Sequence, residues 1–174
     1  ENIARLANEL TSFTRHYQEC ARELSNLRSL AATRLSTAVE EEIQRLGMPG
    51  GRFVIELRPQ ASSDPAPHGL EQVELLGSAN PGQPLKALAK VASGGELSRI
   101  SLAIQVITAQ TSRVPTLVFD EVDVGIGGPT AEIVGQLLRR LGERGQVLTV
   151  THLPQVAAQC HQHLFVHKVR ESET

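Results

Sequence analysis

The chain has 174 residues, of which 40% are hydrophobic and 21% are charged, enough for one domain with an apolar core and an additional segment. Seventeen basic and nineteen acidic side chains give a formal net charge of -2, so the overall charge does not indicate a nucleic-acid or membrane surface. No apolar run approaches the roughly 20 residues of a bilayer-spanning helix, and we expect neither a secretory leader nor a membrane partner. Two distant cysteines, Cys20 and Cys160, favour a reducing, cytoplasmic location over a disulfide framework.

The first segment has the apolar pattern of a long coiled-coil helix. Apolar or semi-apolar residues recur at steps of three and four: Ile3, Leu6, Leu10, Phe13, Tyr17, Cys20, Leu24, Leu27 and Ala31. This spacing makes a narrow seam that requires a second helix, either in a dimer or elsewhere in a longer protein. The alternative is a long surface helix. Because glycine and proline at 47–51 end the pattern, we predict an arm helix over 1–46 and a second domain over 47–174.

The second domain has the pattern of an α/β fold. Apolar residues alternate in 52–58, which predicts a strand, and 70–76 is the expected returning strand of a hairpin. The further expected elements are a helix with Leu97, Ile100, Ile104 and Ile107, a strand at 116–119, a helix starting near Pro129, a strand at 146–150, a helix starting at 153–154 and a strand at 164–166. Apolar strands that alternate with helices indicate a parallel sheet covered by helices on both faces.

Four residues, Ser93, Gly94, Gly95 and Glu96, stand at the start of a predicted helix. Their simplest interpretation is a capping box, in which the side chains of Ser93 and Glu96 each bond a backbone amide of the other. Two adjacent glycines lower helix propensity and are not needed for a cap alone. They would leave bare amides at the positive end of the helix dipole, an arrangement that suits a phosphate group.

Acidic residues follow the predicted strand at 116–119. Asp120 and Glu121 come directly after it, and Asp123 lies on the same turn. At the carboxyl edge of a parallel sheet, one acid can hold Mg²⁺ and the next can orient an attacking water. The alternative is an ordinary acidic turn. His152 ends the next predicted strand, and parallel pairing would bring it beside these acids.

One phosphate-binding motif is absent from the sequence. The pattern G-x-x-x-x-G-K-[ST] does not occur in the 174 residues, and none of the lysines, Lys86, Lys90 and Lys168, follows a glycine. The chain therefore carries no loop of its own that would wrap the β- and γ-phosphates of a nucleotide.

The order of these motifs resembles the second half of an ABC-type ATPase head. The longer segments 80–86, 90–100 and 119–128 are similar to the RecN family of bacterial DNA repair proteins, which are relatives of the SMC proteins. The similarity extends from about Asn80 to His167. It implies that the chain is the C-terminal lobe of a split head, with a parallel sheet flanked by helices, joined to the descending helix of a coiled-coil arm.

The resemblance also implies a role for each candidate site residue. Segment 93–96 matches the signature motif, which closes over the γ-phosphate of ATP bound to a second head. Asp120 matches the Walker B aspartate that supports Mg²⁺, and Glu121 matches the glutamate that polarises the attacking water. Asp123 matches the D-loop acid at the head–head contact, and His152 matches the switch histidine that senses the γ-phosphate.

The implied cofactors are ATP and Mg²⁺. The implied partners are the N-terminal lobe of the same protein, which carries the Walker A loop, a second head in an ATP-dependent homodimer, and DNA. The implied function is ATP hydrolysis in DNA double-strand-break repair by a cytoplasmic, nucleoid-associated protein, with this chain inactive on its own. Two other functions stay open: a non-catalytic coiled-coil assembly module, and a Mg²⁺-dependent nuclease that uses Asp120, Glu121 and Asp123.

Overall fold

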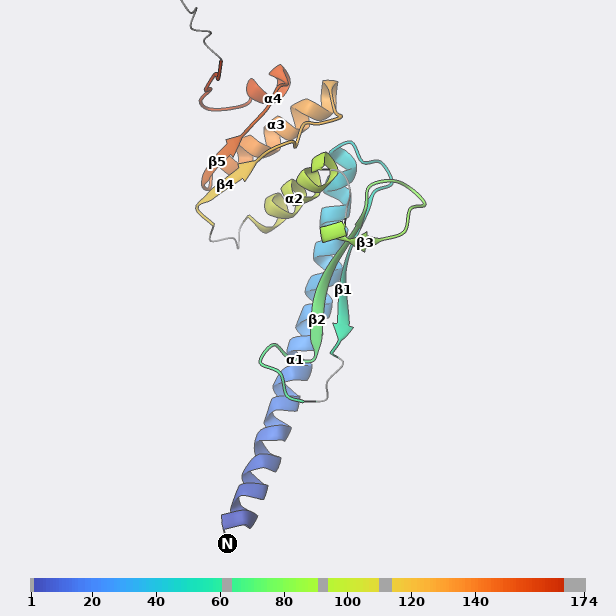
Figure 1. The fold of residues 1–174 in the computed structure, drawn as a ribbon, viewed down its shortest axis with the longest axis vertical. Coiled ribbons are helices and arrows are strands. Elements are labelled where there is room, and N and C mark those ends of the chain that lie inside the picture. The colour runs from blue at the N-terminus through green and yellow to red at the C-terminus, as the bar shows by residue number, and fades with distance from the viewer. Residues whose placement is uncertain (1, 61–63, 91–93, 110–113, 168–174) are drawn as a thin grey trace, which may run out of the picture. The chain divides into compact units, whose positions relative to one another are not determined.

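A computed structural model describes residues 2–60, 64–90, 94–109 and 114–167 (Figure 1). The chain divides into two compact units, residues 1–93 and residues 94–174. Within the described ranges, no helix combines the length and the apolar composition needed to cross a membrane. The candidate site residues from Gly94 onward all belong to the second unit, whereas Ser93 lies outside the described residues.

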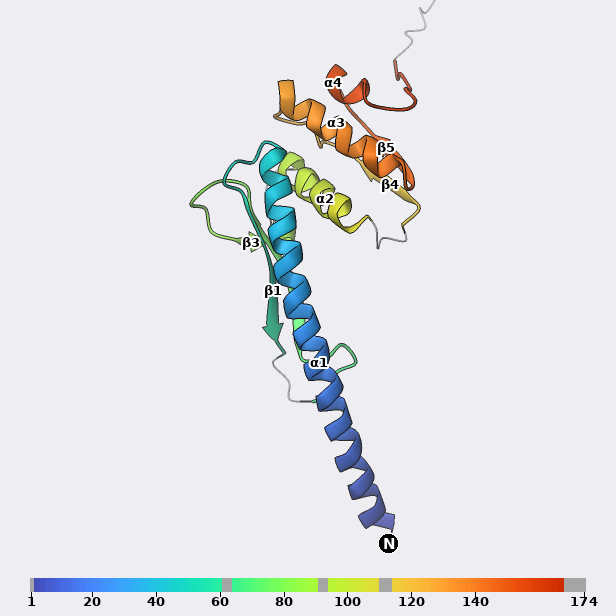
Figure 2. The same ribbon diagram turned by 180° about the vertical axis from the view of Figure 1, so that it is seen from behind.

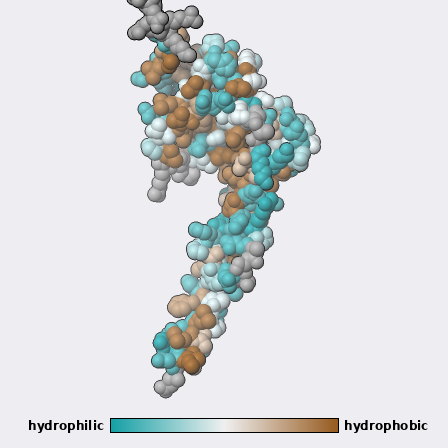
Figure 3. Space-filling view, viewed as in Figure 1, coloured by the Kyte–Doolittle hydropathy of each residue, from teal (hydrophilic) through white to brown (hydrophobic). Residues whose placement is uncertain are grey.

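A single long helix, α1 (Asn2–Arg45), dominates the first unit and confirms that the N-terminal segment is helical as predicted. It ends before Gly47, whose backbone φ of 79° lies in the left-handed region that glycine adopts without strain. The apolar seam stays uncovered near the N-terminus, where Ile3 and Phe13 are 84% and 70% exposed (Figure 3). Such an exposed seam matches a coiled-coil helix without its partner helix.

An antiparallel hairpin completes the first unit and lies alongside α1 in both ribbon views (Figures 1 and 2). Strands β1 (Arg52–Pro59) and β2 (Glu71–Ser78) pair over their whole length, which confirms the predicted hairpin. A short strand β3 (Lys86–Ala87) pairs with β2 and leads into a 3-10 turn, η1 (Leu88–Lys90).

The core of the first unit lies between the C-terminal part of α1 and β1. Its buried apolar side chains include Val39, Ile43, Leu46, Met48 and Phe53. Helix α1 also covers the outer edge of β1: the backbone N–H of Phe53 donates to the Glu40 carboxylate at 3.1 Å, and that of Ile55 donates to the Ser36 hydroxyl at 2.9 Å. These two bonds occupy N–H groups on the free edge of β1. Without them, that edge could pair with a strand of another molecule.

The second unit has a β–α–β arrangement. Its elements are α2 (Gly94–Thr108), β4 (Thr116–Phe119), α3 (Gly128–Gly142), β5 (Gln146–Thr149) and α4 (Pro154–Ala157). Strands β4 and β5 pair in parallel, so the prediction of a parallel sheet flanked by helices is confirmed. Helix α3 packs against α2, β5 and α4, and Pro129 stands in its first turn as expected.

The sheet of the second unit differs from the prediction in two respects. On one face, Val118, Leu148 and Val150 are 68%, 47% and 64% exposed. No helix within the described residues covers this face, contrary to the expectation of helices on both faces. The predicted strand at 164–166 is also wrong: it joins no sheet, and its three apolar side chains are at least 81% exposed. Apolar residues specify a strand only where a neighbouring strand supplies backbone pairing, and 164–166 has none in the described part of the chain.

Candidate functional site

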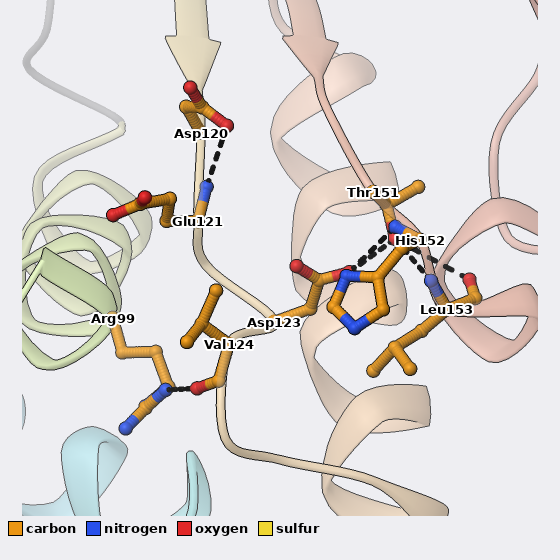
Figure 4. Close-up of polar contacts among 8 residues, drawn as sticks. All are labelled: Arg99, Asp120, Glu121, Asp123, Val124, Thr151, His152 and Leu153. Atoms are coloured by element: carbon orange, nitrogen blue, oxygen red, sulfur yellow. Dashed lines mark hydrogen bonds and ion pairs between the residues drawn. The ribbon is translucent and has the colours of Figure 1, made fainter.

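The two strand ends of the second unit lie side by side. Phe119 and Thr149, the last residues of β4 and β5, are partners in the parallel register. The N–H of Val150 then bonds the carbonyl of Phe119 at 3.0 Å and extends the pairing by one step. The segment that follows β4 and the segment that follows β5 therefore leave the sheet at the same edge, as the sequence predicts (Figure 4).

Asp120 and Glu121 leave the end of β4 in different directions. Both are exposed, and Oδ1 of Asp120 accepts a hydrogen bond from the backbone N–H of Glu121 at 2.9 Å. Glu121 has a φ of 59°, a left-handed conformation that is uncommon for a residue with a side chain. This turn directs the Glu121 side chain toward α2, while Asp120 stays at the end of β4 (Figure 4).

The two glycines at the start of α2 are in contact with the acidic turn. A Cβ on Gly94 would collide with the Glu121 carboxylate. A Cβ on Gly95 would lie 3.2 Å from the Val124 carbonyl oxygen and 3.3 Å from that of Glu121. Gly94 is exposed and Gly95 is buried, so one glycine leaves an open helix tip and the other allows close packing of two backbones. Only the first of these two reasons could be predicted from the sequence.

Two further side chains of α2 hold the acidic turn, and the sequence argument did not single them out. The Ser98 hydroxyl donates to the Asp120 carbonyl at 2.8 Å. Arg99 donates to the Val124 carbonyl at 2.7 Å, as Figure 4 shows. Arg99 is only 6% exposed. Burial lowers the pKa of its guanidinium, and the attraction of Glu96 in the first turn of α2 opposes this shift. The only sign in the sequence that Ser98 and Arg99 belong to the site is their position about one helical turn after the glycines.

Asp123 connects the loop after β4 to the loop after β5. Its side chain is 2% exposed, and its Oδ2 accepts hydrogen bonds from the Thr151 hydroxyl and from the His152 backbone N–H, the latter at 3.3 Å. Nδ1 of His152 lies 3.6 Å from the same oxygen, while the imidazole itself is 68% exposed (Figure 4). The two residues that follow Asp123 in this loop, Val124 and Gly125, are exposed.

Gly95→Ala is expected to lower the free energy of unfolding by about 1–3 kcal/mol, because the new methyl group meets backbone atoms that cannot move separately. Gly94→Ala is the matched control, since its methyl group meets only the end of the flexible Glu121 side chain. Urea denaturation of the two variants, followed by circular dichroism, measures the difference. Equal destabilisation by both variants would contradict the packing role of Gly95.

The exposed groups at this edge fit a nucleotide phosphate and a magnesium ion. Asp120 offers the oxygen ligand that Mg²⁺ prefers, and the tip of the 15-residue helix α2 at Gly94 offers the positive end of a dipole to an anion. No three His, Cys, Asp or Glu side chains within the described ranges gather into a metal site of their own. Such an edge suits Mg²⁺ held jointly by a carboxylate and phosphate oxygens.

Solved structures with this fold are head domains of Smc proteins. An Smc head domain with a coiled coil and joint from Pyrococcus yayanosii has a TM-score of 0.61 at 22% identity, over 91% of this chain and 29% of that chain. An Smc head domain with an extended coiled coil, bound to the C-terminal domain of ScpA from Pyrococcus furiosus, has a TM-score of 0.59 at 22% identity, over 90% of this chain and 37% of that chain. The chain therefore has the fold of part of an Smc-type head domain.

Comparison with sequence relatives identifies the family of the chain. The chain is 52% identical to the DNA repair protein RecN of Xylella fastidiosa over 95% of its length, and 51% identical to that of Vibrio cholerae over 97%. It spans 29% and 30% of these two relatives. A RecN of Streptomyces coelicolor is 43% identical over 87% of the chain and 28% of that relative. No family model matches the sequence. The chain belongs to the RecN family.

Proposed function

We propose that this chain is the C-terminal lobe of an ATP-hydrolysing head in an SMC-like DNA repair protein. The observation that carries the proposal is the common edge at which β4 and β5 end. Asp120 and Glu121 follow one strand and His152 follows the other, and the open tip of α2 lies beside Glu121. Phosphoryl transfer requires a metal ligand, an oriented water and donors for the phosphate charge, and this edge carries residues of each kind.

Each exposed residue of the edge has one task in this proposal. The carboxylate of Asp120 holds Mg²⁺ together with the phosphates. Glu121 orients the attacking water and accepts its proton. His152 donates a hydrogen bond toward the terminal phosphate from the neighbouring loop. MgATP supplies the phosphoryl group, and the protein supplies position and charge complementarity rather than a covalent nucleophile.

The tip of α2 serves a second nucleotide, bound to another head. Gly94 is exposed at the helix N-terminus, where backbone N–H groups and the helix dipole favour a phosphate. The first-turn residue Glu96 belongs to the same proposed contact, as does Ser93, which lies outside the described residues. The loop of Asp123 would face the second head through its exposed residues Val124 and Gly125.

The missing parts of the nucleotide pocket would come from an N-terminal lobe of the same protein. The sequence contains no Walker A pattern, and the chain spans only about three tenths of the RecN relatives. The exposed face of β4 and β5, with Val118, Leu148 and Val150, offers an apolar surface for such a lobe. The uncovered seam of α1 would pack against the ascending helix of the coiled-coil arm.

The DNA-related part of the proposal is carried by the relatives, which are named DNA repair proteins. In this scheme, ATP joins two heads and hydrolysis releases them, which moves the arms and any DNA that they hold. The site of action would be the nucleoid in the cytoplasm, in the repair of double-strand breaks by recombination.

Co-purification of the chain with the N-terminal lobe, followed by light scattering with and without ATP, tests this function. We expect ATP and Mg²⁺ to convert single heads into dimers, and Glu121→Gln to make the dimers persist because the bound ATP is not consumed. A non-catalytic assembly module would associate equally with and without ATP. Nicking of plasmid DNA that depends on Asp120 would instead identify a nuclease.

A further inference from the structure

Asp123 is a buried carboxylate whose side-chain hydrogen bonds, among the residues that the structure describes, all lead to one loop. With 2% of its side chain exposed, its charge is removed from solvent, which is costly unless hydrogen bonds compensate. The compensation comes from Thr151 and His152, which follow β5, and both bond the same oxygen, Oδ2. A buried carboxylate that bonds two successive residues of another loop fixes the position of that loop.

The loop that Asp123 holds is the one that presents His152. The backbone N–H of His152 is bonded at 3.3 Å, and its Nδ1 faces the carboxylate at 3.6 Å. The rest of the ring stays in solvent, at 68% exposure. With Nδ1 turned toward a carboxylate, the Nε2 side of the imidazole is the side left to meet a ligand. A carboxylate that faces one nitrogen of the rigid imidazole ring thereby sets the direction of the other nitrogen.

Thr151 links the carboxylate to the following helix as well. Its hydroxyl donates to Asp123, and it accepts a hydrogen bond from the Leu153 backbone N–H at 3.1 Å, one residue before α4 begins. The hydroxyl therefore acts both as a donor and as an acceptor. It connects the loop after β4 with the start of α4 through two consecutive hydrogen bonds. A valine at this position would have the same shape but neither bond.

We propose that Asp123 and Thr151 are positioning residues for His152, and that they hold its imidazole with Nε2 directed out of the edge where β4 and β5 end. This inference rests on the proposed function, because it gives His152 a phosphate to meet. It assigns the buried carboxylate a task inside its own head, separate from the contact with a second head that the family resemblance implies.

The test uses steady-state ATP hydrolysis by the complete protein. Thr151→Val is expected to lower kcat about tenfold, the effect of one lost hydrogen bond to a charged group, with little change in KM. Thr151→Ser keeps the hydroxyl and should keep the activity. The matched control is Thr149→Val, which removes a buried hydroxyl that has no hydrogen-bond partner in the described part of the chain, and its kcat should equal that of the wild type.

A double-variant comparison separates positioning from general stability. In a His152→Ala background, Thr151→Val should cause no further loss of kcat, because no ring remains to be positioned. Equal losses in both backgrounds would overturn the proposal. If Thr151→Val does not fold, Asp123→Asn replaces it, and its loss of kcat is compared between the wild-type and His152→Ala backgrounds. Asparagine removes the charge that faces Nδ1 but retains an acceptor oxygen.

A parallel measurement on Glu121→Gln separates failure of the proposed ATPase function from failure of the positioning role of Asp123 and Thr151. Unchanged hydrolysis by Glu121→Gln would reject the proposed function itself. Loss of hydrolysis by Glu121→Gln, together with equal kcat values for Thr151→Val and Thr149→Val, would reject only the positioning role.

Discussion

Glu121→Gln in the complete protein is expected to lower the rate of ATP hydrolysis by about two to four orders of magnitude, the usual contribution of a positioned general base. Glutamine keeps the size of the side chain and its place beside Gly94, but it does not accept a proton from water. Binding of ATP should be unaffected, because the substituted group acts on the water rather than on the nucleotide. Phosphate release and equilibrium binding of a fluorescent ATP analogue measure the two effects separately.

Glu132→Gln is the control for this substitution. Glu132 is an exposed residue of α3 in the same unit, and its carboxylate accepts a hydrogen bond from the Gln136 side chain, one helical turn away, at 3.3 Å. The same chemical change there should leave hydrolysis intact. Hydrolysis that survives Glu121→Gln, or that falls equally in both variants, would contradict the role given to Glu121.

The chain alone is expected to show no ATP hydrolysis above background, and added N-terminal lobe is expected to restore it in a saturable manner. The reason is the absence from the sequence of any glycine-rich loop with a lysine to hold the β- and γ-phosphates. The measurement is phosphate release during titration of the chain with the purified lobe. Circular dichroism on the chain alone verifies that it is helical before the lobe is added.

Asp120→Asn serves as the control in this titration. The variant should still bind the lobe, because Asp120 is not part of the exposed apolar face, but it should not restore hydrolysis without a proper Mg²⁺ ligand. Sustained hydrolysis by the isolated chain that disappears on Glu121→Gln would mean that it holds a nucleotide without a second lobe. The split-head proposal would then be wrong.

Local patterns predicted most of the secondary structure. The three- and four-residue steps from Ile3 onward specify α1 because a helix turns once in 3.6 residues. The alternation of Phe53, Ile55 and Leu57 specifies β1 because successive side chains of a strand alternate between its two faces. The parallel pairing of β4 and β5 followed from the helix between them, and this pairing brought the acidic turn and His152 to one edge.

Features that depend on contacts between distant residues were not predicted. The strand expected at 164–166 was wrong because an apolar run does not reveal whether a neighbouring strand exists to pair with it. In the sequence, Arg99 is an ordinary helix residue, because its bond to the Val124 carbonyl depends on the folding of a loop 25 positions later. The role of Thr151 could not be predicted for the same reason. Nothing near it in the sequence indicates that its hydroxyl meets a buried carboxylate 28 positions earlier.

The close packing of Gly95 and Arg99 against the turn after β4 has a consequence for an assembly of two heads. One chain would give its α2 tip to one pocket and its acidic turn to the other, and these two parts are clamped together by backbone contact and by a buried guanidinium. Displacement of either part would be transmitted to the other through a contiguous set of contacts. In the proposed pair of heads, a shift of the acidic turn in one pocket would therefore also shift the helix tip that the same chain offers to the other pocket.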